Sequence, residues 1–152
     1  MNINTYEIHD GDLLISTDKA SLDRAYIHQF LSERSYWAKG IPLETMNHSI
    51  EHSLCFGMYR VGRQIGFARA VTDCATFAWL ADVFIDESER AGGLGKKLVS
   101  AILAHPQLQG LRRLMLGTRD AHGLYARYGF KPLEYVERFM QIQDLDPYNS
   151  GS

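Results

Sequence analysis

The chain lacks the features that define several large classes of protein. Only two of its 152 residues are cysteine, and because Cys55 and Cys74 both lie in apolar stretches, we interpret them as small buried side chains. No apolar run is long enough to cross a bilayer, and no N-terminal segment has the apolar core of a signal peptide. We therefore expect a cytoplasmic protein with reduced thiols and no membrane partner.

Neither sign of charge is in excess. The 16 Lys and Arg and 18 Asp and Glu residues give a net charge of −2, and the basic residues are scattered, which argues against a nucleic-acid partner. His48 and His52 lie four residues apart on an expected helix, but no glutamate base motif accompanies them, so we expect no metal site. Length and 45% hydrophobic content predict one domain over residues 1–145, followed by a tail, 146–152, that we expect to be disordered.

Residues 79–98 carry the strongest functional pattern. An apolar run over 80–85 predicts a buried strand, and Leu94, Leu98 and Ile102 recur four residues apart, which predicts a helix. Between them lies the glycine-rich tract 90–95. The first turn of a helix has free N–H groups and a positive dipole end, and glycine lets an anion approach them closely. The tract therefore predicts a phosphate site, with Arg90 as a fixed cation beside it.

Two common phosphate-binding loops do not fit this tract. A Walker A loop needs Ser or Thr where this chain has Lys97, and a dinucleotide loop needs a third glycine where it has Leu98. The spacing of Arg90, Gly93 and Gly95 instead resembles the pyrophosphate-binding motif of the GNAT family of N-acetyltransferases, which bind acyl-coenzyme A.

A second tract resembles the same family. It follows a predicted strand at 114–117 and consists of Leu124, Tyr125, Gly129 and Phe130. In the family this tyrosine lies beside the cofactor sulfur. The family often has an asparagine seven residues earlier, where this chain has Thr118, a departure that removes one side-chain contact to the cofactor. The resemblance covers residues 50–145 well and residues 1–50 only in general layout.

The resemblance implies the GNAT fold, an α/β architecture in which helices flank a central, mixed, mostly antiparallel sheet. Its known feature is a splayed gap between two neighbouring strands, expected here at 76–85 and 111–117, where the pantetheine arm lies. The pattern of apolar and turn residues predicts the order β-α-α-β-β-β-α-β-α-β-β. The expected strands are a broken first strand (6–8 and 13–16), 54–59, 64–71, 76–85, 111–116, 131–136 and 139–142; the expected helices are 21–32, 43–52, 93–106 and 118–129.

The resemblance also implies acetyl-CoA as the cofactor. Val83, Phe84 and Ile85 would hold its pantetheine arm through their main chain. Tyr125 is the expected general acid, because a phenol pKa near 10 lies above a thiol pKa of about 8.5, so the phenol stays protonated and can donate to the leaving thiolate. The remaining cofactor-binding residues are Arg90, Ala91, Gly92, Gly93, Leu94, Gly95, Lys96 and Thr118.

Asp82 is the candidate general base. It is a carboxylate within an apolar strand, where an unpaired charge is costly, so it either faces the substrate or pairs with an arginine. Tyr36 and Trp37, in the loop 35–42, are candidates for the wall of the acceptor pocket; the alternative is packing against the core. His122, one helical turn before Tyr125, is either a further substrate-binding residue or a histidine of the helix surface.

We therefore predict an N-acetyltransferase that moves an acetyl group from acetyl-CoA to a primary amine of a small molecule or peptide, by direct transfer in a ternary complex. The alternative is a non-catalytic acyl-CoA sensor or regulatory module on the same fold, which would not need an acid at Tyr125. Because the loop 35–42 is aromatic rather than acidic, a polycationic acceptor is not favoured. Many members of the family pair as dimers, so a homodimer is compatible with the resemblance.

Overall fold

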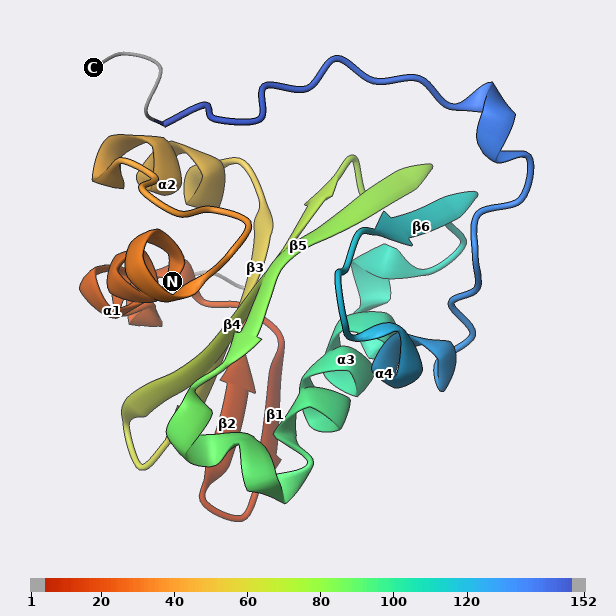
Figure 1. Ribbon diagram of the computed structural model, residues 1–152. Coiled ribbons are helices and arrows are strands. Elements are labelled where there is room, and N and C mark those ends of the chain that lie inside the picture. The colour runs from red at the N-terminus through yellow and green to blue at the C-terminus, as the bar shows by residue number, and fades with distance from the viewer. Residues whose placement is uncertain (1–4, 149–152) are drawn as a thin grey trace.

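The order of strands in the sheet follows their order in the chain. The computed structural model describes residues 5–148 and contains one six-stranded sheet with the order β1-β2-β3-β4-β5-β6 (Figure 1). The first five strands pair antiparallel, and β6 runs parallel to β5, which gives the mixed sheet that the sequence predicted. The strands are β1 (Glu7–Asp10), β2 (Leu13–Ser16), β3 (Leu54–Arg60), β4 (Arg63–Thr72), β5 (Phe77–Ile85) and β6 (Arg113–Leu116).

Helices cover both faces of this sheet. In Figure 1, α1 (Arg24–Gln29) and α2 (Leu43–Glu51) lie on one side, and α3 (Leu94–Ala104) and α4 (His122–Ala126) lie on the other. A π-helical turn, Phe30–Arg34, extends α1, and short 3₁₀ helices occupy Lys19–Ser21, Glu87–Gly92, Pro106–Leu108 and Val136–Arg138. None of the helices among residues 5–148 combines the length and the apolar character that crossing a membrane requires.

Alternation along the strands builds two hydrophobic cores. On β3, Phe56 and Met58 point to the face covered by α3, whereas Cys55 points to the face covered by α1 and α2. Cys55 is buried as predicted, and this burial raises the pKa of its thiol to about 11. Phe84 of β5 stacks on Phe30 with ring centres 3.8 Å apart, so β5 is held firmly against the first core helix and its extension.

A bulge in β5 opens the sheet. Phe67 faces Phe84 and Arg69 faces Ala81, so Ala68 alone opposes both Asp82 and Val83. The backbone of Asp82 is left-handed, with a φ of 55°. Pairing between β5 and β6 involves only Phe77–Leu80, although β5 continues to Ile85. The predicted gap between these two strands is therefore present, and it begins at the bulge.

The C-terminal part of the predicted topology is wrong. Residues 131–136 and 139–142 form no strand; after Gly129 the chain turns away from β6 through Pro132 and through Tyr135, whose φ is 55°, and then runs over the top of the molecule in Figure 1. The first strand is two strands, because Gly11, with a φ of 62°, reverses the chain into a hairpin. Of the expected tail, residues 149–152 lie outside the described residues.

A substitution at Leu98 tests how much the core between the sheet and α3 contributes to stability. Its side chain on α3 is 0% exposed, so Leu98→Ala should lower the free energy of unfolding by about 2–5 kcal/mol through lost burial and a residual cavity. Leu43→Ala, the same change at a helical side chain that is 48% exposed, should cost less than about 1 kcal/mol. Urea denaturation of both variants measures the difference, and equal costs would contradict the assigned core.

Candidate active site

The gap between β5 and β6 holds a cavity of about 350 Å³. Its walls come from the loop before α2, the middle of β5, the loop after β6, and α4. The structure therefore brings together six of the residues selected from the sequence: Tyr36, Trp37, Asp82, Val83, Thr118 and Tyr125. The other lining residues are Ala38, Ile41, Arg69, Trp79, Leu80, Ala81, Leu116, Gly117, Asp120, Ala121 and Tyr148.

Tyr125 presents a free hydroxyl to this cavity. Its ring is buried and packs edge-on against Phe130, with ring centres 5.6 Å apart, while the hydroxyl makes no hydrogen bond to any described residue. Burial of the side chain is the main cause, and the nearby Tyr36 the smaller one, that raises the pKa of Tyr125 to about 12. At ordinary pH the side chain is therefore a neutral phenol whose proton is available to a bound group.

Asp82 is paired, which realises one of the two alternatives left open by the sequence. Its Oδ2 accepts a hydrogen bond of 2.6 Å from Nε of Arg69, and its Oδ1 accepts one of 2.7 Å from the indole nitrogen of Trp37. Nη1 of Arg69 donates to Oγ of Ser53 at 3.0 Å. The Asp82 side chain is only 8% exposed, so it lies at the inner wall of the cavity with its charge compensated.

The loop 35–42 is tied to both sides of the gap. Besides the Trp37 contact with β5, the Tyr36 hydroxyl accepts a hydrogen bond from the backbone N–H of Arg119 at 2.9 Å. The Arg119 guanidinium lies 3.9 Å from the centre of the Tyr36 ring, a cation–π contact. Tyr36 and Trp37 thus form one wall of the cavity, although both residues are more than two-fifths exposed.

The anion-binding tract lies at the start of α3. Residues Glu87–Gly92 form a 3₁₀ helix rather than an open loop, and Gly93, with a φ of 70°, turns the chain into α3 at Leu94. Nε of Arg90 donates to the carbonyl of Ile85 at 3.1 Å, while the side chain as a whole remains exposed. Phe84 and Ile85 are buried, so only their main chain is available to a ligand.

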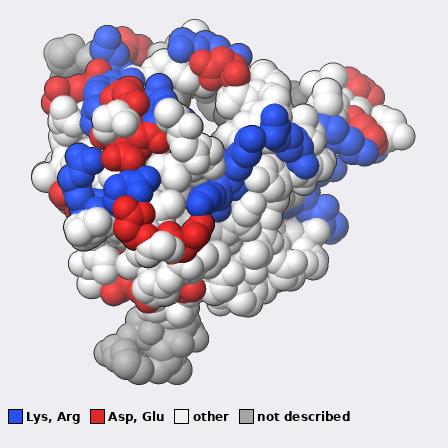
Figure 2. Space-filling view, turned by 90° about the horizontal axis from the view of Figure 1, so that it is seen from below, with Lys and Arg blue, Asp and Glu red and all other residues white. Residues whose placement is uncertain are grey.

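Charged side chains are unevenly spread over the surface. Seen from below in Figure 2, Lys and Arg side chains form a band across one half of the face, whereas both signs mix on the other half. Of the two lysines that follow Gly95, Lys97 pairs with Asp10, and Lys96 is exposed without an ion pair to any described residue. An anion at the first turn of α3 would therefore meet Lys96 and Arg90 together with the helix dipole.

His122 does not belong to the cavity. It is exposed on α4 and is absent from the lining, as expected for a histidine of the helix surface. Arg69, Asp120 and Tyr148 also line the cavity, although the sequence did not predict them there. An arginine partner for Asp82 was anticipated, but its position was not, because strand register decides which arginine lies opposite. Tyr148 fell in the expected tail, yet it packs against the core on the α2 side.

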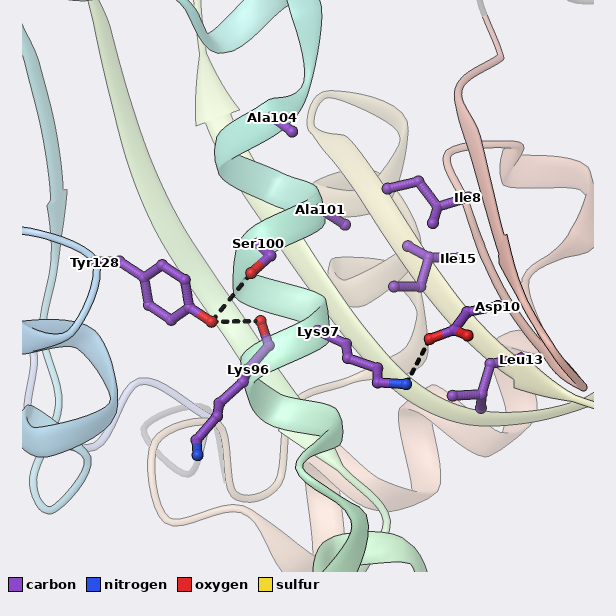
Figure 3. Close-up of a pocket in the computed structure, with 10 residues that line it drawn as sticks. All are labelled: Ile8, Asp10, Leu13, Ile15, Lys96, Lys97, Ser100, Ala101, Ala104 and Tyr128. Carbon is purple, nitrogen blue, oxygen red and sulfur yellow. Dashed lines mark hydrogen bonds and ion pairs between the residues drawn. The ribbon is translucent and has the colours of Figure 1, made fainter.

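A second hollow, of about 370 Å³, lies elsewhere, between α3 and the first hairpin. Figure 3 shows its aliphatic walls, formed by Ile8, Leu13 and Ile15 of the hairpin and by alanines of α3. The ion pair of Lys97 with Asp10 crosses one end. It contains only Lys96 of the residues selected from the sequence, so it is separate from the gap. No cluster of three metal-ligating side chains occurs within residues 5–148.

Comparisons with known proteins agree with this geometry. A family model described as an acetyltransferase (GNAT) domain matches residues 51–132. A Gibberella zeae protein, provisionally named an acetyltransferase, is 32% identical over 139 residues, and the match covers 77% of this chain and 77% of that protein. A Xanthomonas campestris protein described as belonging to the GNAT family is 48% identical, with a TM-score of 0.89 over 91% of this chain and 97% of its own. A GNAT acetyltransferase from Elizabethkingia anophelis, solved with acetyl-CoA bound, is 14% identical with a TM-score of 0.62 over 85% of each chain, so it shows likeness of fold.

The ion pair between Arg69 and Asp82 predicts how substitutions at these two positions change the free energy of unfolding. Arg69→Met keeps most of the apolar stem but leaves a nearly buried carboxylate without its cation, which should cost about 3–5 kcal/mol. Adding Asp82→Asn removes that unpaired charge and keeps a residue that tolerates a left-handed backbone. The double variant should therefore be more stable than Arg69→Met alone in chemical denaturation. Simple additivity of the two single effects would show that the pair is not coupled.

Proposed function

The chain belongs to the GNAT acetyltransferase family, and from this premise we propose that it transfers the acetyl group of acetyl-CoA to a primary amine of a small molecule. The observation that carries the proposal is the free, protonated hydroxyl of Tyr125 in the cavity where β5 and β6 separate. This hydroxyl opens onto the cavity and makes no hydrogen bond to a described residue, which suits a group that must donate a proton to a bound ligand.

The residues around the gap fit acetyl-CoA. Beyond Leu80, β5 has no strand partner on the β6 side, so its main chain from Val83 onward is open to an extended amide-containing arm, except for the carbonyl of Ile85, which accepts from Nε of Arg90. At Gly93 a Cβ would meet nothing within 4 Å, so the turn before α3 leaves room for a pyrophosphate. Lys96 and the guanidinium of Arg90 would compensate its charge. Acetyl-CoA bound to the Elizabethkingia relative of the same fold supports this assignment.

Transfer requires one bond to form and one to break. The amine nitrogen attacks the thioester carbonyl carbon, the carbon–sulfur bond breaks, and the sulfur leaves as a thiolate. Tyr125 gives its proton to that sulfur as the carbon–sulfur bond breaks, because its pKa of about 12 keeps the phenol protonated beforehand. The proton that the attacking amine loses then restores the phenol. Backbone N–H groups in the β5 bulge, at Val83 to Ile85, would polarise the carbonyl oxygen.

We assign Asp82 to the acceptor amine. Each of its oxygens accepts one hydrogen bond within the protein, from Arg69 or from Trp37, and a carboxylate oxygen has lone pairs for a second. An ammonium group placed there would lie beside the bulge and could pass its proton to the carboxylate directly or through water. The double anchoring fixes the position of this carboxylate, which favours orientation of the amine as much as proton removal.

The walls of the cavity favour a small acceptor with an apolar or aromatic body. Tyr36, Trp37 and Trp79 offer flat faces, and Asp120 at the loop after β6 carries a carboxylate without an ion pair to any described residue. Aromatic faces and a carboxylate both attract a cationic amine.

The test of the proposed function is calorimetric titration of the protein with acetyl-CoA, followed by a panel of amines with thiol release as the readout.

Gly93 provides the sharpest test of the cofactor site. Gly93→Asp places a negative charge at the first turn of α3 and should weaken acetyl-CoA binding at least tenfold, or about 1.4 kcal/mol. Gly110→Asp is the matched control, because that glycine also has a positive φ, 71°, and open space around it but lies far along the chain from the tract. Calorimetry on both variants checks the prediction, and equal affinities would remove the assigned pyrophosphate site.

Tyr125→Phe should lower kcat about 10²-fold or more and leave acetyl-CoA affinity nearly unchanged, because it removes only the donated proton. The control is Tyr128→Phe, which loses a hydroxyl that hydrogen bonds to Ser100 and the carbonyl of Lys96 outside the cavity. Full turnover by Tyr125→Phe would contradict the role assigned to this residue. Binding without turnover of any amine by the wild type would instead indicate a sensor.

The raised pKa of Tyr125 also predicts the shape of the pH profile. The donor is the protonated form, which persists below a pKa of about 12, so loss of this acid should not lower kcat between pH 7 and 10. Stopped-flow or steady-state rates of thiol release over that range measure the profile. A fall in kcat with a midpoint near pH 9 that disappears in Tyr125→Phe would contradict the assignment.

A further inference from the structure

The C-terminal segment, residues 139–148, brings a tyrosine to the cavity at the gap. In Figure 1 the segment crosses the top of the molecule from the α4 side toward α2, outside the sheet. Tyr148, at the end of this course, is half-buried and lines the cavity. No step of the proposed transfer uses its side chain, so Tyr148 is a cavity residue whose role the transfer chemistry leaves open.

Tyr148 borders the acceptor side of the cavity. It packs against the core cluster on the α1 and α2 face of the sheet, which includes Ala38 and Ile41 of the loop 35–42. At Gly40 of the same loop, a Cβ would come within 3.7 Å of the Tyr148 Cβ. The pyrophosphate site at the first turn of α3 lies on the opposite face of the sheet (Figure 1). The ring therefore borders the space assigned to the amine.

The segment that carries Tyr148 has few contacts of its own. At its start, the Arg113 guanidinium lies 4.8 Å from the centre of the Phe139 ring. Among residues 5–148, no backbone–backbone hydrogen bond involves residues 140–145. Met140 is 98% exposed, and Ile142 is as exposed as in an open chain. The packing of Tyr148 therefore helps to fix the course of a segment that lacks most of the contacts that make a region rigid.

Tyr148 adds a fourth aromatic side chain to the cavity, beside Tyr36, Trp37 and Trp79. Aromatic faces attract a cationic amine and pack against a flat apolar body. The cavity measures only about 350 Å³, so the ring of a single tyrosine takes up a large share of the space beside it. Its presence or absence would therefore change which acceptors fit.

We propose that Tyr148 is a specificity-determining residue for the acceptor, an inference that rests on the proposed function. Its ring contacts the body of a small aromatic amine and limits how far that body extends toward α2. The segment 139–148 carries this wall across from the α4 side. An amine with a larger body meets the ring and is a poorer substrate.

Substitutions that shrink or enlarge the side chain test this role. The readout is the ratio of kcat/KM for phenethylamine to kcat/KM for its analogue with a second phenyl ring on the carbon that bears the first. Tyr148→Ala removes the wall, so the ratio should fall at least about tenfold, mainly through KM. Tyr148→Trp enlarges the wall and should raise the ratio. Tyr148→Phe keeps the ring and should retain the wild-type ratio.

Ile142→Ala is the matched control, because it truncates a fully exposed side chain on the same segment and should not change the ratio. Calorimetry with acetyl-CoA on each variant should give the wild-type affinity, since Tyr148 lies away from the pyrophosphate site. An unchanged ratio in both Tyr148→Ala and Tyr148→Trp, with acetyl-CoA bound and amines turned over, overturns the role of Tyr148 and leaves the proposed function standing. A wild type that binds acetyl-CoA but acetylates neither amine nor any other of the panel contradicts the proposed function, and the role of Tyr148 with it.

Discussion

The bulge at Asp82 is the constraint on which the site depends. A left-handed aspartate in the middle of β5 sets two residues against Ala68, ends the pairing with β6 at Leu80, and leaves the following main chain open. Such backbone costs free energy unless neighbouring groups hold it, and here Arg69 and Trp37 each bind one carboxylate oxygen. One carboxylate thereby stabilises the bend in the sheet and orders the aromatic loop at the mouth of the cavity.

Two regions that are separate in the chain would serve the proposed reaction. The turn before α3 offers N–H groups and exposed cations to an anion, and the cavity at the gap is lined by Tyr125 and Asp82, where an amine and a thioester would meet. The proposed chemistry needs no rearrangement of these groups, because the phenol is already protonated and bonds to no residue among 5–148, and the carboxylate is already fixed. Rigid positioning of this kind is the main contribution a protein makes to acyl transfer.

Local sequence signals predicted the helices and strands in the centre of the chain. The features that the sequence did not predict depend on contacts between residues far apart in the chain. The strand before Asp86, the glycine turn and the helix from Leu94 are set by adjacent residues, so these elements and a mixed sheet were predictable from the sequence. The gap was expected from the family resemblance. The partner of Asp82 was not, because it depends on which arginine the register of β4 brings opposite. Residues 131–142 have the alternating pattern of a strand but form none. Such a pattern shows that a segment could pair with a sheet, but it does not show whether a free sheet edge lies within its reach. Tyr148 reached the cavity only through that unexpected course.

The most direct test of the account is to map where coenzyme A binds, by amide chemical shifts of the ¹⁵N-labelled protein during titration. If coenzyme A binds at the gap, the largest changes should occur at the main chain of Val83 and Ile85 and at the first turn of α3, from Leu94 to Lys96, with smaller changes around Thr118. Changes centred instead on Ile8, Ile15 and Ala104, in the hollow between α3 and the first hairpin, would contradict it, since the gap opened by the bulge would then not be the cofactor site.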